Sequence, residues 1–342
     1  MEKQKILKIE ISHRTVIFTV FFLLFLWLLY QIRHILVILF VGVILMSALN
    51  PLIERLEKLK IPRVLGVILV YLLIFGIFTL ILAGIIPPLI TQTSNLASRI
   101  PSYYKSLSLW GMSNDLFNSQ IEYFLSRLSS ISFDLVKITI GFLGNFLVIF
   151  TLIFVNFYLL LERKNLDNYL RKLFGPNSKK AERVINKVEQ RLGEWLRAQI
   201  TLMLIVGIMC YLGLRFLGID FALPLALLAG ILEVIPNIGP TLSAIPAIIA
   251  GLAVSPLTGL AVFALYFLVQ QLENHIIVPQ IMRKEVGVNP LVTILALAAG
   301  FKIGGILGAV LSLPFIILLE TILKEFFLSR EIYTSEKKKV SF

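Results

Sequence analysis

Long apolar runs alternate with short polar stretches along the whole chain, and the runs are long enough to cross a lipid bilayer. The first run extends from Val16 to Leu49 and is interrupted only by the polar residues around Arg33. As one helix it would measure about 50 Å at about 1.5 Å per residue, whereas the hydrocarbon core is about 30 Å thick. We therefore expect two short spans with a turn near residues 31–34, then a basic loop at 50–63. Further single spans are expected at 64–86, 138–161 and 195–217.

Two apolar segments near the C-terminus have a different pattern. Segments 222–253 and 290–325 are too long for one straight crossing and somewhat short for two, and each has glycine or proline at its centre. In lipid, a broken helix leaves backbone groups unpaired at a cost of several kcal/mol each, unless protein or water satisfies them. We therefore expect two re-entrant or broken helical hairpins beside a cavity, flanking one true span from Pro256 to about His275. Close packing of the second hairpin is expected at four glycines: Gly300, Gly304, Gly305 and Gly308.

Composition fits this pattern. Hydrophobic residues make up 58% of the 342 residues and charged residues only 15%, with a mean hydropathy of +0.89. Soluble domains carry about 25% charged residues. The fold class expected is an all-α polytopic membrane protein with about five to eight transmembrane helices, including the two hairpins.

The distribution of basic residues predicts the orientation in the membrane. Ten lysines and arginines lie within 162–197, against four within 91–137, so the positive-inside rule places the first region in the cytoplasm and the second outside. The net charge of +12 is then explained by cytoplasmic loops, without nucleic-acid binding. We expect an inner (plasma) membrane protein with both termini cytoplasmic.

The expected spans and loops divide the chain into six parts. Residues 1–90 hold the N-terminal spans, and 91–137 form an extracytoplasmic amphipathic helical region that either binds solute or only packs against the bundle. A span at 138–161 leads to basic cytoplasmic helices at 162–194, broken at Gly175-Pro176-Asn177-Ser178. Residues 195–328 form the transport core, and 329–342 a basic tail.

The sequence lacks the usual marks of an enzyme or a metal site. Cys210 is the single cysteine, and His13, His34 and His275 have no metal-ligand spacing. No phosphate-cradling G-x-x-x-x-G-K-[ST] motif occurs. We expect no enzyme activity, no cofactor and no metal.

Two acidic residues lie deep in apolar sequence, where a charge costs at least about 2.5–3.5 kcal/mol at the bilayer centre. Glu233 stands just before a helix-breaking stretch, and with it we expect a substrate-facing element made of Pro236, Asn237, Gly239 and Pro240. Glu273 sits among the polar residues Gln270, Gln271 and Asn274. It either couples transport to a proton or cation, or belongs to a capping network near the cytoplasmic interface. Lys302 could neutralise one of the two carboxylates.

The two hairpin segments resemble each other weakly. Ala229-Gly230 aligns with Ala299-Gly300, and 243–246 aligns with 312–314. Paired broken segments point to the substrate site of a transporter; chance similarity between apolar stretches is the alternative.

Several motifs resemble the autoinducer-2 exporter family. They are E-V-I-P-N-I-G-P at 233–240, Q-Q-L-E-N at 270–274, V-P-Q-I-M at 278–282, the run 288–315, and I-P-R at 61–63. The resemblance covers nearly the whole chain and implies an ATP-independent transporter of small solutes that forms a homo-oligomer. Some members are associated with autoinducer-2 export and others with sodium/proton antiport. Asn237 stands where an aromatic residue is more usual.

The sequence therefore predicts a secondary transporter that exports a small polar solute such as autoinducer-2, with Glu273 as the ion-coupling carboxylate. Two alternatives remain: a sodium/proton antiporter, and a membrane scaffold subunit that transports nothing.

Overall fold

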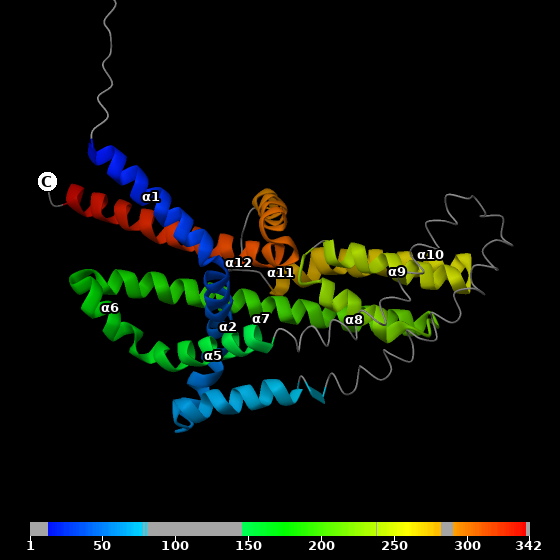
Figure 1. Ribbon diagram of the computed structural model, residues 1–342. Helices are drawn as coiled ribbons and strands as arrows, with labels where there is room; N and C mark the ends of the chain where they lie inside the picture. Colours follow the sequence, from blue (N-terminus) through cyan, green and yellow to red (C-terminus); the bar gives the residue numbers. More distant parts are fainter. Residues whose placement is uncertain (1–12, 78, 81–145, 237, 282–289, 340–342) are drawn as a thin grey trace, which may run out of the picture.

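The computed structural model describes residues 13–77, 79–80, 146–236, 238–281 and 290–339, and every regular element in these ranges is a helix (Figure 1). Five of the described helices are long and apolar enough to cross a membrane, and three shorter apolar helices accompany them. The prediction of an all-α polytopic membrane protein is confirmed. The region at 91–137 and Asn237 lie outside the described residues.

The N-terminal apolar run forms two helices, α1 (His13–Gln31) and α2 (Arg33–Lys58), which meet at Ile32. The two expected spans and the break between them near residues 31–34 are confirmed, but helical hydrogen bonds continue across the junction. The N–H of Ile32 donates to Leu28 O and that of Leu36 to Ile32 O, both at 3.0 Å. The chain therefore bends at this point and does not reverse. α2 also continues to Lys58, so most of the expected 50–63 loop is helical.

Three helices pack together in the N-terminal half: α2, the helix Arg63–Ile77 and α5 (Phe146–Glu162). Asn156 of α5 is buried between them. Its amide donates to Gly42 O, and its carbonyl oxygen accepts from the Tyr71 hydroxyl, both at 2.7 Å. These bonds join three helices in an environment where a polar side chain has few other partners.

The basic region forms helices in the expected places. A short 3-10 turn (Arg163–Asn165) leads to α6 (Leu166–Phe174), which ends at Gly175, a residue with φ of +50°. A second 3-10 turn (Gly175–Asn177) precedes α7 (Ser178–Phe216). α7 has 39 residues, corresponding to about 58 Å, and packs against α2, α6, α8, α10 and α12. It runs through the middle of the described helices (Figure 1).

The first C-terminal segment folds as a helical hairpin along α7. α8 (Ala222–Leu232) and α9 (Ile238–Val254) pack against each other, and α10 (Pro256–Leu272) packs against α9 and α7. A π-helical turn (Glu273–Ile277) and α11 (Val278–Ile281) follow α10. Gly230 of α8 faces Gly207 of α7, and a Cβ on Gly230 would lie 2.8 Å from Met203 O. The glycines let the two backbones almost touch.

The second segment also folds back on itself, although it is one nominal helix, α12 (Pro290–Lys339). Helical geometry breaks at Gly304 (φ −133°) and Gly305 (φ 60°, ψ −144°). Gly300 and Gly308 then face each other, since a Cβ on Gly300 would lie 2.4 Å from Gly308 O. The glycines thus close the hairpin on itself: Gly300 and Gly308 form the contact, while Gly304 and Gly305 form the turn.

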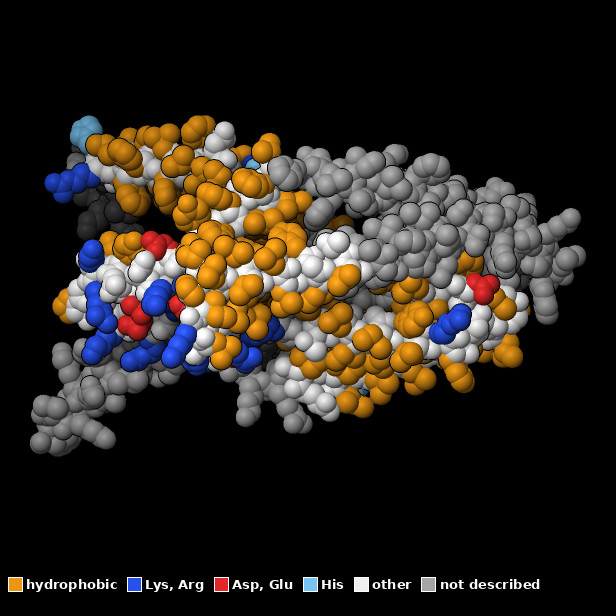
Figure 2. Space-filling model, turned by 90° about the horizontal axis from the view of Figure 1, so that it is seen from below, with side chains coloured by type: hydrophobic (Ala, Val, Ile, Leu, Met, Phe, Trp, Pro, Cys, Tyr) orange, Lys and Arg blue, Asp and Glu red, His pale blue; other side chains and the backbone are white. Residues whose placement is uncertain are grey.

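Charged side chains gather at one end of the molecule, and apolar side chains cover its middle (Figure 2). At the charged end Arg63 pairs with Glu57 at 2.8 Å, and Arg163 pairs with Glu189. Arg191 of α7 pairs with Glu320 of α12 at 3.0 Å and donates to the Thr321 hydroxyl at 2.8 Å. Of these contacts, Arg163 fastens the turn after α5 to α7, and Arg191 fastens the second hairpin to α7.

Candidate functional site

The break between α8 and α9 places an acidic residue inside the bundle. Glu233 caps the C-terminus of α8 and is fully buried. The helix cannot continue, because Pro236 lacks a backbone donor and constrains the residue before it. Gly239 closes the turn: a Cβ there would lie 2.0 Å from Leu232 O. Pro240 O accepts from the buried Ser243 hydroxyl at 2.9 Å.

The second acidic residue lies where α10 changes its helical geometry. Glu273 opens the π-helical turn and is 2% exposed. Gln270 Nε2 lies 3.4 Å from Glu273 Oε2, a long hydrogen bond. Such π-turns are frequent at functional sites, because the extra residue re-aims side chains.

The structure brings these two carboxyl groups next to each other. Apart from the neighbouring Glu273 carboxyl group, no described residue forms a hydrogen bond with either carboxyl oxygen of Glu233. Two adjacent carboxylates shielded from water repel each other strongly and also lose hydration. The pair therefore requires a proton or another cation to be stable.

Three further polar side chains lie around the pair, and the sequence prediction missed all of them. Gln199 of α7 donates to the Glu233 backbone carbonyl at 2.7 Å, while its own amide oxygen is buried without a partner among the described residues. The buried Tyr266 hydroxyl lies beside the Cys210 thiol and has this thiol as its hydrogen-bonding neighbour. Gln199 is a polar residue in mostly apolar sequence, the same signal that singled out Glu233 and Glu273, whereas Tyr266 and Cys210 count as apolar in the sequence pattern and give no such signal.

Other predicted site residues are placed elsewhere. Gln271 and Asn274 are exposed on the outside of α10 and its π-turn, so the structure does not join them to the carboxyl pair. Lys302 is also exposed, and no described acidic side chain pairs with it. Neutralisation of Glu233 or Glu273 by Lys302 is therefore wrong for this structure. Within the described ranges, no three His, Cys, Asp or Glu side chains cluster as metal ligands would.

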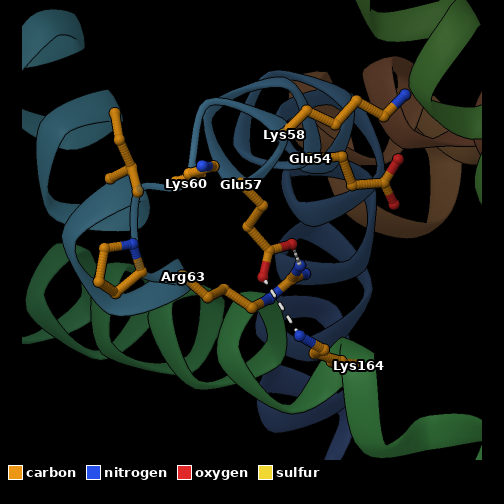
Figure 3. Close-up of a pocket in the computed structure, with 8 residues that line it drawn as sticks. Glu54, Glu57, Lys58, Lys60, Arg63 and Lys164 are labelled. Carbon is orange, nitrogen blue, oxygen red and sulfur yellow. Dashed lines mark hydrogen bonds and ion pairs between the residues drawn. The ribbon is translucent and has the colours of Figure 1, made fainter.

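A separate hollow of about 610 Å³ lies at the charged end (Figure 3). Its lining residues are Glu54, Glu57, Lys58, Lys60, Ile61, Pro62, Arg63 and Lys164. Glu57 is paired with Arg63 and, at 3.6 Å, with Lys164. Arg63 also donates to Leu160 O and Asn50 Oδ1, both at 2.7 Å. These bonds hold α2, the helix Arg63–Ile77 and α5 together, so we assign the hollow a structural role.

Comparison with known proteins decides the family. The family model described as "AI-2E family transporter" matches residues 16–327. The chain belongs to the AI-2E family of transporters. It is 30% identical over 290 residues to the candidate transport protein YueF of Bacillus subtilis, covering 79% of this chain and 77% of that protein. It is also 24% identical over 245 residues to the candidate permease PerM of Escherichia coli, covering 69% and 68%.

This membership agrees with the resemblance seen in the sequence, and it supports a membrane transporter over a passive scaffold. The match spans both hairpins and all of α7. The buried carboxyl pair of this AI-2E protein therefore lies within the matched region.

Proposed function

We propose that this AI-2E protein is a secondary, ATP-independent transporter whose coupling ion binds at Glu233 and Glu273. The observation that carries the proposal is the pair itself: two buried carboxyl groups side by side, one at the break of the first hairpin and the other in the π-turn after α10. Ionisable groups inside membrane bundles are costly and usually mark ion or substrate pathways. A pair that needs one positive charge can exchange a proton for a cation or release it as solute moves.

The solute we propose is a small polar molecule such as autoinducer-2, moved outward. The family description supports autoinducer-2, and the site chemistry is compatible with it. Oxygen atoms of Gln199, Glu233 and Glu273 offer acceptors, which suit a ligand rich in hydroxyl donors. Pro236, Gly239 and Pro240 shape the turn, and Gln270 lies at the pair. Gln271 and Asn274 remain proposed substrate contacts only for another state of the protein. Asn237, which lies outside the described residues, also remains a proposed substrate contact.

One observation favours sodium/proton antiport as a second candidate. Among the described residues, oxygens predominate among the buried polar side-chain atoms at the site: Gln199 Oε1, the carboxyl oxygens of Glu233 and the Tyr266 hydroxyl. Hard cations such as sodium prefer oxygen ligands. We further propose a homo-oligomer in the plasma membrane with the charged end in the cytoplasm, in keeping with the positive-inside rule.

Flux in proteoliposomes tests the proposal. Purified protein is reconstituted with a pH-sensitive dye inside, and sodium or autoinducer-2 is then added outside in separate experiments. We expect Glu233→Gln and Glu273→Gln each to abolish proton-coupled movement, because an amide cannot carry the coupling charge. Proton movement driven by sodium alone would identify the antiporter, and movement driven by autoinducer-2 would identify the solute exporter.

The matched control is Glu182→Gln on the cytoplasmic part of α7, which removes the same charge far from the pair. It should keep native flux. Normal coupled flux in both Glu233→Gln and Glu273→Gln would contradict the coupling role. Absence of any flux from the native protein would instead favour the scaffold.

A further inference from the structure

One face of α7 carries buried residues at helical spacing along the transport core. They are Gln199, Leu202, Val206, Cys210 and Leu214, each at most 1% exposed. Intervals of three and four keep them on a single stripe. Gln199 and Cys210 lie about 16 Å apart along the axis, which is roughly half of the hydrocarbon thickness. Between these two positions the stripe therefore begins with the Gln199 amide and ends with the Cys210 thiol.

Polar groups from three other elements lie along the same stripe. The Glu233 backbone carbonyl accepts from Gln199 at one end. The Cys210 thiol at the other end lies beside Tyr266 and close enough to Glu233 and Glu273 to interact with both. The carboxyl pair thus lies between Gln199 and Cys210. The α8–α9 break, α10 and the π-turn all contribute to one buried polar column.

Packing explains the apolar part of this face, because Val206, Cys210 and Tyr266 belong to one buried hydrophobic cluster, but it does not explain the buried polar atoms. Buried polar groups are normally hydrogen-bonded, and each exception calls for a ligand, water or functional role. Here the amide oxygen of Gln199 has no partner among the described residues, and the Glu233 carboxyl group and the Tyr266 hydroxyl have only the ionisable side chains of Glu273 and Cys210 beside them. Apolar side chains of similar size would pack this space without that cost.

Building on the transport function above, we propose that this column is the path for water and solute through the bundle, closed in this structure at both ends. Toward Gly218, the apolar cluster that includes Leu214, Ile219, Phe221 and Leu225 closes it. Toward the charged end, the cluster around Leu192 and Trp195 closes it. The path opens when the first hairpin and α10 separate from α7, and Cys210 then meets water.

The native chain contains a reporter for this event, because Cys210 is its single cysteine. A small, membrane-impermeant, cationic methanethiosulfonate reagent forms a disulfide with a thiolate and releases methanesulfinate. Thiolates form only where water or polar groups support them. We expect this reagent to modify Cys210 in sealed proteoliposomes, and expect the doubly substituted Glu233→Gln, Glu273→Gln protein to react more slowly because the attracting carboxylates are gone.

Two cysteine variants in a Cys210→Ala chain are the controls. Leu212→Cys places a thiol on the exposed apolar face of α7, and Ala250→Cys places one in the same apolar cluster as Cys210. We expect Cys210 to react at least about ten-fold faster than either, because only it lies on a path that water enters. Labelling after denaturation gives the total thiol for each protein.

The labelling and flux measurements together separate a failure of the proposed path from a failure of the proposed coupling role. An unreactive Cys210, or one no faster than Ala250→Cys, overturns the path even when flux in the same vesicles still depends on both carboxylates. Fast, selective labelling of Cys210 supports the path, and in that case flux that ignores both carboxylates overturns the coupling role alone.

Discussion

The turn of the second hairpin offers a test in which four nearby glycines have different expected effects on substitution. Gly300 and Gly308 pack backbone against backbone: a Cβ on Gly300 would lie 2.4 Å from Gly308 O, and a Cβ on Gly308 would lie 2.1 Å from Gly300 O. Carbon and oxygen cannot approach so closely, and backbone atoms cannot rotate away as side chains can. Alanine at either position therefore forces the two halves of α12 apart.

The expected magnitudes follow from local geometry. Overpacking typically lowers the free energy of unfolding by about 1–3 kcal/mol. Because the clashing atoms here belong to the backbone and cannot rotate away, we expect Gly300→Ala and Gly308→Ala to cost about 3 kcal/mol each. Gly305 has open space around it but lies at φ 60°, ψ −144°, so Gly305→Ala costs about 1–3 kcal/mol of backbone strain. Gly304 has open space and negative φ, so Gly304→Ala is neutral or stabilising by about 0.5 kcal/mol.

Thermal unfolding of the purified protein in detergent, followed by tryptophan fluorescence, measures this order. We expect the transition temperature to fall most for Gly300→Ala and Gly308→Ala, less for Gly305→Ala, and not at all for Gly304→Ala. If Gly304→Ala is as damaging as Gly300→Ala, the two halves of α12 do not meet as described. The double substitution Gly300→Ala, Gly308→Ala should cost less stability than the two single substitutions added together, because both disrupt the same contact.

The remaining predictions concern the N-terminal helices and use the same thermal unfolding measurement. Lys60 has φ of 66° at the end of α2, so Lys60→Gly should stabilise the protein by up to about 1 kcal/mol, and a destabilised variant would show that the lysine side chain matters more than its backbone strain. Asn156→Ala should destabilise by about 1–3 kcal/mol because it leaves Tyr71 and Gly42 without a shared partner, whereas a wild-type transition would refute this linking role. Glu189→Gln removes the charge that accepts from Arg163 and Asn50 and should cost about 1–2 kcal/mol, well above the matched Glu182→Gln.

Local chemistry made the helix breaks predictable from sequence. Proline at 236 and 240 and glycine at 304 and 305 act on their own backbone, so their effect needs no knowledge of distant contacts. The same holds for the break at Gly175, where φ is +50°. The break at Ile32 lies within the predicted stretch 31–34, but polar residues at a junction do not show whether the chain bends or reverses there.

Long-range contacts were not predictable in this way. The meeting of Glu233 with Glu273 depends on how α8 and α10 pack against α7, which hydrophobic pattern alone does not specify. Helical geometry does predict that the polar residues at the end of α10 cannot all belong to one site. Successive helical residues project about 100° apart, so Glu273 and its neighbours Gln271 and Asn274 could not all face one buried site.

The two hairpins are built alike but are not equivalent in the fold. In each, a buried serine donates to the carbonyl three residues earlier: Ser243 to Pro240 O at 2.9 Å, and Ser312 to Ala309 O at 2.7 Å. Yet the break of the first faces α7 with Glu233 fully buried, whereas Ile303 at the break of the second is 88% exposed. Since burial beside a second carboxyl group is what makes Glu233 require a cation, the second hairpin has no matching site. In the proposed function, coupling therefore uses the break of the first hairpin and the π-turn after α10, whereas the second hairpin is fastened to α7 through Arg191 and Glu320.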